Sequence, residues 1–166
     1  MNTPRTRQEV AALLQAHGVH ATRQRIDVAH ALFGQTRHLS AEDILEYLNT
    51  GPTTETDTDL GRGPLAGRSN DRPVTRRAVS KATVYNTLRL LLERGAIRAL
   101  VVEATRVLYD PNNAPHHHFF NTLTGELTDF PAGPVTVEGL PVPPAGTVAD
   151  GVDIVVRIRP TAQTSR

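Results

Sequence analysis

Residues 80–110 have the sequence SKATVYNTLRLLLERGAIRALVVEATRVLYD, and this stretch decides the expected fold. Its first half predicts a helix over residues 80–94, because Ser80 is a good N-cap and Gly95 is a typical terminator. Steps of about 100° per residue place four apolar side chains on one face: Val84, Leu88, Leu91 and Leu92. The opposite face carries Ala82, Asn86, Arg89 and Glu93. One face is therefore expected to enter a core, while the other is free to contact a partner.

Two β-rich segments follow this helix, residues 97–102 and 106–109, and the short spacer between them favours a hairpin. Three further helices are predicted upstream: residues 6–17, residues 22–34 and a third that starts at Ser40. The start at Ser40 is well marked, because two acidic residues follow in the first turn. Gly34 is expected to close the second helix in a left-handed conformation. Three helices, a further helix and a hairpin together predict a winged helix.

The remainder of the chain has a different composition. Periodicity is lost over residues 50–79, where Gly, Thr, Asp, Arg and Pro dominate, so we expect a flexible insertion there. Beyond residue 110, alternating apolar residues predict a small sheet with strands in residues 115–120, 125–130 and 152–159. The expected fold class is α+β, with an N-terminal winged-helix domain over residues 1–110 and a small α/β domain over residues 111–166. The second domain has few residues for a core, so dimerisation is expected to add burial.

The composition restricts the chemistry of the chain. Its 166 residues carry a formal net charge of +1 and include no cysteine. Disulfides, thiolate zinc sites and thiol catalysis are therefore excluded, and any bound metal must be held by nitrogen and oxygen. No apolar run is long enough to span a membrane, and residues 1–8 are polar without the core of a signal peptide. The expected compartment is the cytoplasm, with no membrane partner.

The exposed face of the helix over residues 80–94 suits the major groove of double-stranded DNA. Asn can pair with adenine, a Tyr ring can pack on thymine methyl groups, and Arg can contact guanine or phosphate. The low net charge means that binding depends on these local residues. The candidate DNA-binding residues are Arg23, Arg25, Ser80, Thr83, Tyr85, Asn86 and Arg89. The alternative is that they only make a helix face soluble.

Three consecutive histidines, His116 to His118, are the second notable motif. On a strand His116 and His118 point to one side and His117 to the other, so the first and third form a chelating pair. Nearby carboxylates and an upstream histidine can complete a nitrogen and oxygen site for Fe²⁺ or Mn²⁺, with Zn²⁺ as an alternative in vitro. The candidate metal ligands are His38, Asp110, His116, His118 and Asp129.

The chain resembles the ferric uptake regulator family in five short motifs: TRQR at 22–25, HLSAE at 38–42, ATVYNTL at 82–88, YD at 109–110 and HHH at 116–118. The resemblance covers nearly the whole chain outside the insertion. It looks closest to the iron response regulators (Irr), because the cysteine pairs of many members are absent and the VDIVVRIR segment at 152–159 is similar. It implies a dimeric repressor of iron, haem or peroxide-defence genes that binds an A/T-rich inverted repeat.

The resemblance also implies residue roles. The family's regulatory metal site falls on the five candidate ligands, and its DNA-reading tyrosine falls on Tyr85. Asn121 and Thr124 stand where structural zinc cysteines would be, so no structural four-cysteine zinc site is expected. The cysteine-proline haem motif of some iron response regulators is missing. Haem, if bound, would therefore use one of the three consecutive histidines: His116, His117 or His118.

These expectations combine into one mechanism. Metal binding would tie the DNA-binding domain to the dimerisation and metal-sensing domain, and so set the spacing of two groove helices in a homodimer. A peroxide-sensing repressor that uses Fe or Mn is the main alternative. A non-haem Fe²⁺ oxygenase is a remote alternative, since no nearby segment suggests a cofactor pocket, and no enzyme activity is expected. A third alternative is a ligand-responsive winged helix whose histidines only pack.

Overall fold

The computed structural model describes residues 4–50, 78–104, 106–133 and 135–161. The expected insertion over residues 50–79 lies almost entirely outside these residues. Four helices come first: α1 (Arg7–Ala16), α2 (Arg23–Phe33), α3 (Ala41–Thr50) and α4 (Lys81–Glu93). Five strands follow: β1 (Arg98–Glu103), β2 (Arg106–Asp110), β3 (His116–Asn121), β4 (Leu127–Pro131) and β5 (Val155–Ile158). This mixture is consistent with the α+β class.

The helices begin where the sequence predicts. Thr6, Thr22 and Ser80 each accept a hydrogen bond from the backbone N–H three residues later. Ser40 forms the same contact with the N–H of Asp43, whose carboxylate accepts the N–H of Ser40 in return. Reciprocal contacts of this kind satisfy the donors that a helix start leaves without partners.

The expected left-handed ending of α2 is wrong. Gly34 caps the helix with φ of −84° and ψ of 0°, an ordinary conformation. Glycine is needed there for another reason, because a Cβ atom would lie 2.6 Å from the carbonyl oxygen of His30. Gly18 and Gly95, after α1 and α4, do have positive φ values of 68° and 62°.

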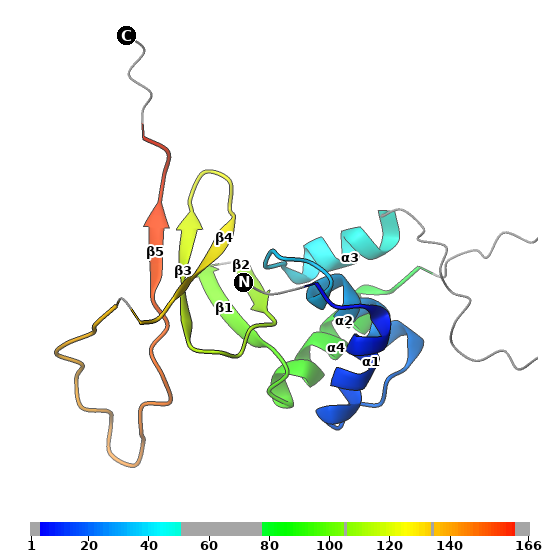
Figure 1. Cartoon of the computed structure of the whole chain (residues 1–166), viewed down its shortest axis with the longest axis horizontal. Helices are drawn as coiled ribbons and strands as arrows, with labels where there is room; N and C mark the ends of the chain where they lie inside the picture. The colour runs from blue at the N-terminus through cyan, green and yellow to red at the C-terminus, as the bar shows by residue number, and fades with distance from the viewer. Residues whose placement is uncertain (1–3, 51–77, 105, 134, 162–166) are drawn as a thin grey trace, which may run out of the picture.

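Two clusters of apolar side chains form the core of the described residues. Figure 1 shows how the helices and strands that supply them are arranged. The helices pack together on one side, where α4 buries Val84, Leu88 and Leu91 as expected. The antiparallel β1–β2 hairpin lies between the helices and the second sheet. This hairpin contributes Tyr109 to the helical cluster and Leu108 to the cluster beneath the second sheet. The hairpin therefore joins the two halves, and the division of the chain at residue 110 stays a prediction.

The second sheet has the order β4-β3-β5. Strand β3 pairs with β4 in antiparallel fashion and with β5 in parallel fashion. The late strand is shorter than the expected segment of residues 152–159. Val155 packs against the cluster, whereas Val156 and Ile158 are 38% and 42% exposed. None of the described helices is both long and apolar enough to span a membrane.

Candidate metal centre and helix face

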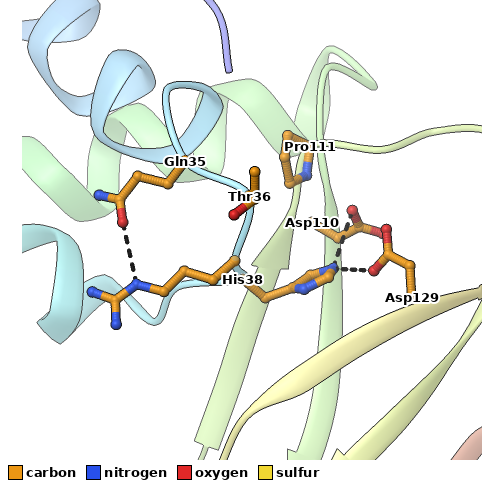
Figure 2. Close-up of a pocket in the computed structure, with 7 residues that line it drawn as sticks. Gln35, Thr36, His38, Asp110, Pro111 and Asp129 are labelled. Atoms are coloured by element: carbon orange, nitrogen blue, oxygen red, sulfur yellow. Dashed lines mark hydrogen bonds and ion pairs between the residues drawn. The ribbon is translucent and has the colours of Figure 1, made fainter. Parts of the chain in front are cut away.

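Five side chains that were predicted as metal ligands lie together. His38, Asp110, His116 and His118 each offer a ligand atom, and these atoms lie within 4.8 Å of one another. Asp129 joins them, because its Oδ1 atom is 3.2 Å from His38 Nε2 and 3.6 Å from His118 Nε2. Figure 2 shows His38 facing the carboxylates of Asp110 and Asp129. The cluster thus contains three imidazoles and two carboxylates.

The backbone explains how distant residues meet here. The N–H of Tyr109 donates to the carbonyl of Leu39 at 2.9 Å, which sets the loop before α3 beside the end of β2. His38 precedes Leu39 and Asp110 follows Tyr109, so this antiparallel bridge makes His38 and Asp110 neighbours. On the second sheet the register of β3 and β4 places His118 opposite Asp129.

Several buried polar atoms of the cluster lack hydrogen-bond partners. The side chains of Asp110 and His118 are fully buried, and those of His38 and His116 are only 5% exposed. Among the described residues, no hydrogen-bond partner is present for Nε2 of the three histidines or for Oδ1 of Asp129. Buried polar atoms without partners are unfavourable, and here they converge on one place. A divalent cation fits this donor set.

A backbone hydrogen bond orients the ring of His116. Its Nδ1 atom lies 2.7 Å from the carbonyl oxygen of Ala114. A carbonyl only accepts, so Nδ1 carries a proton and donates it there, and Nε2 is the nitrogen that faces Asp110. That Nε2 atom lies 3.1 Å from Asp110 Oδ2.

Burial and charge set the protonation of the cluster. Burial, followed by the nearby imidazoles of His38 and His116, lowers the pKa of His118 to about 4, against the opposing effect of two carboxylates. Burial raises the pKa of Asp110, but the imidazole of His38 and the N–H of Asn112 outweigh it and hold that pKa below its usual value. At neutral pH, His118 is therefore neutral and Asp110 is charged, as coordination requires.

Two cavities differ greatly in size. One of about 10 Å³ is lined by His38, Asp110 and Asp129 together with Gln35, Thr36, Arg37 and Pro111, and it suits a single ion. His117 points to the other side of β3, where its ring packs against Phe130 with the centroids 5.6 Å apart. A second cavity of about 520 Å³ is lined in part by His116, His117 and Arg98. His116 therefore borders the second cavity as well as belonging to the ligand cluster.

The predicted DNA-binding residues are spread over two helices. Tyr85, Asn86 and Arg89 are exposed on α4, and Ser80 and Thr83 contact each other through their hydroxyl groups at its start. Arg23 is exposed at the start of α2. Arg25 is half-buried, and its guanidinium donates to the carbonyl of His20.

Residues around Tyr85 were not predicted. The phenol of Tyr85 donates to Glu42 at 2.5 Å, and Lys81 Nζ lies 5.4 Å from the centre of its ring. Lys81 is exposed in the first turn of α4. Because it directly follows the predicted N-cap Ser80, the sequence could have indicated it as a candidate for phosphate contact. Arg98, beside the histidine cluster, was also missed.

We expect the metal-free protein to lose free energy of unfolding as the pH falls from about 6.5 towards about 4. In this pH window His118 is protonated in the unfolded chain but stays neutral in the folded protein, so proton binding favours the unfolded state. Urea unfolding at about pH 7 and about pH 5 measures the change. His118→Asn should show a weaker pH dependence, and His20→Asn, at an exposed position, should match the unaltered chain. Equal pH dependence in His118→Asn would contradict the prediction.

Comparison with known proteins supports the expected family. Residues 74–138 match the model of the ferric uptake regulator family. The peroxide-responsive repressor PerR of Staphylococcus aureus (strain USA300) is 27% identical over 123 residues, or 74% of this chain. The match spans 66% of that relative, slightly less than two thirds of its length.

Solved structures show the same fold. A ferric uptake regulator from Pseudomonas aeruginosa with manganese is 19% identical, covers 91% of this chain and 97% of its own, and has a TM-score of 0.54. A zinc-bound manganese uptake regulator is 18% identical, with 95% and 100% coverage and a TM-score of 0.56. The matched residues 74–138 include α4, the hairpin and four of the five clustered side chains. The chain is thus similar to the ferric uptake regulator family over residues 74–138, and it shares its fold with these solved regulators.

Proposed function

We propose that the chain is a metal-responsive, DNA-binding transcription regulator and not an enzyme. One observation carries the proposal: the five clustered side chains come from three parts of the fold. His38 precedes α3, Asp110 ends the hairpin, and the others lie on β3 and β4. The cavity of about 10 Å³ beside them leaves no room for a substrate and a co-substrate, which an oxygenase would need.

The donor set indicates the class of metal. Three imidazole nitrogens and two carboxylates suit Fe²⁺ or Mn²⁺, with Zn²⁺ as an alternative in vitro. Manganese and zinc are named with the structurally similar regulators described above. The bound ion would supply positive charge that draws these five side chains together. With no cysteine in the chain, a structural zinc site of the four-cysteine type has no ligands.

The position of the cluster connects it to DNA binding. His38 lies just before α3, whose Glu42 holds the phenol of Tyr85 on α4. Fixing His38 against β3 and β4 would fix the orientation of the α4 face relative to the second sheet. In a homodimer, that orientation determines whether two α4 helices reach two half-sites of an inverted repeat together. The exposed apolar side chains of Val156 and Ile158 favour a second copy of the chain on that sheet.

Control of iron or haem genes, as in iron response regulators, is the finer proposal. It is supported by the absence of cysteine and by the VDIVVRIR segment. The small cavity at His38 suits an ion, so a haem would use the larger cavity and the histidines that line it, His116 and His117. His116 belongs both to the ligand cluster and to this cavity, so a haem and an ion would share that histidine.

Removing two clustered imidazoles should abolish tight metal binding. We expect His116→Ala with His118→Ala to weaken Mn²⁺ binding by at least roughly 100-fold in calorimetry, because two ligands are lost. His117→Ala is the matched control, since His117 faces away, and it should stay within about threefold. Asp129→Asn, at a partly exposed position, tests the site should the double variant unfold. Unchanged affinity in both test variants would refute the site.

We expect Tyr85 to contribute to sequence-specific DNA binding. We expect Tyr85→Ala to weaken binding of an A/T-rich inverted repeat by roughly 10- to 100-fold, with little change on a random duplex of equal length. Tyr47→Ala is the control, because Tyr47 is equally exposed but lies on α3. The assay should compare the metal-free, Fe²⁺, Mn²⁺ and haem forms of the protein. Equal losses on both duplexes would mean that Tyr85 does not read sequence.

Peroxide sensing is the second candidate, and the PerR relative favours it. Bound Fe²⁺ beside carboxylates can react with peroxide and oxidise a neighbouring imidazole. We expect mass spectrometry of the Fe²⁺-loaded protein after peroxide treatment to show one added oxygen atom on His38 or His116. The Mn²⁺-loaded protein is the control and should remain unmodified. Reversible release from DNA without any modified histidine would exclude this candidate.

A further inference from the structure

A cation of the protein lies against the candidate metal ligands. Arg98, on β1, places its Nη2 atom 3.4 Å from Asp110 Oδ2 and 3.2 Å from His116 Nδ1. Its Nη1 atom lies 3.3 Å from Oδ1 of Asp153, in the segment before β5. A guanidinium in this position is notable, because a bound metal ion would repel it.

Arg98 contacts the carboxylate oxygen of Asp110 that faces His116 and His118, whereas the other oxygen, Oδ1, lies 3.4 Å from His38 Nε2. Asp110 Oδ2 also lies 3.1 Å from His116 Nε2 and 3.7 Å from His118 Nε2. The other oxygen, Oδ1, accepts the N–H of Asn112 at 2.7 Å. An ion bound by these imidazoles would therefore compete with Arg98 for the same oxygen of Asp110.

Hydrogen bonds hold Arg98 only loosely beside this oxygen. His116 Nδ1 already donates to Ala114 and so cannot accept from the guanidinium. The Nε atom of Arg98 has no hydrogen-bond partner among the described residues. Asp110 and Asp153 are thus its two anionic contacts, one fully buried and the other 52% exposed. The guanidinium can move away from buried Asp110 and still keep its contact with exposed Asp153.

The charges around Arg98 balance only when a divalent cation is present. Asp110, Asp129 and Asp153 carry three negative charges, and Arg98 carries one positive charge. A divalent ion brings this group to neutrality, and Asp153 is needed for that balance. Removing the charge of Arg98 should therefore raise metal affinity, because a nearby positive charge opposes the ion. Removing the charge of Asp153 should lower metal affinity, because a nearby negative charge favours the ion.

We propose that Arg98 sets the affinity of the metal site by competing with the ion for Asp110, and that Asp153 is the partner to which it yields. This inference rests on the proposed metal binding. Arg98 is a positioning residue in this scheme. In the metal-free protein it neutralises a buried carboxylate, and in the metal-bound protein its remaining anionic contact is Asp153.

The test is calorimetric titration of the full chain with Mn²⁺ alone. Arg98→Gln should bind Mn²⁺ roughly tenfold more tightly, and Asp153→Asn should bind it several-fold more weakly. The effect of Asp153→Asn should be much smaller when Arg98 is already Gln. Arg98→Lys, which keeps the charge, should resemble the unaltered chain. Arg157→Gln is the matched control, because Arg157 donates to the carbonyl of Val102, and should have little effect.

A second readout separates this role from simple support of the fold. Arg98→Gln should unfold at a lower urea concentration without metal, since Asp110 loses its cation, and should gain more stability from Mn²⁺ than the unaltered chain. Weaker or unchanged Mn²⁺ binding by Arg98→Gln would overturn the inference and leave the proposed function intact. No Mn²⁺ binding by the unaltered chain would overturn both. If Arg98→Gln fails to fold, an effect of the exposed Asp153→Asn on Mn²⁺ affinity, or its absence, still decides.

Discussion

One backbone contact, from the N–H of Tyr109 to the carbonyl of Leu39, supports the arrangement of the site. It sets His38 and Asp110 side by side, although one precedes a helix and the other ends a hairpin. The second sheet then adds its histidines and Asp129 from the opposite direction. Leu39 and Tyr109 are also buried in one apolar cluster, so packing and this hydrogen bond together fix the loop before α3 against β2.

Local patterns predicted most of the elements and the five clustered residues. Caps at Thr6, Thr22 and Ser80 act within one turn of helix, so their signals can be read directly from neighbouring residues. The alternation of side chains on a strand likewise separated His117 from its two neighbours. That all five candidate ligands meet depended on long-range packing, so their residue types suggested the set and the resemblance to a family supported it.

The features that were missed depend on contacts between distant segments. Arg98 lies on a strand expected only to form a hairpin, and nothing near it in sequence marks Asp153 as a partner. The ending of α2 at Gly34 is determined by space beside His30, which a glycine preference alone does not distinguish from a left-handed turn. For β5, alternation predicted a strand over residues 152–159, but the structure limits it to Val155–Ile158, of which Val155 packs against the cluster around Leu100 and Phe120.

The parallel pairing of β3 with β5 has a consequence for how the chain folds. Strands β3 and β4 are joined by a tight turn in which Gly125 has a φ of 71°, so these two strands can pair quickly. Strand β5 must instead return across the long connection from Pro131 to Val155, and closing so large a loop is slow. We therefore expect β5 to dock last. None of the five clustered histidine and aspartate side chains lies on β5, so newly made chains would bring them together before the second sheet is complete.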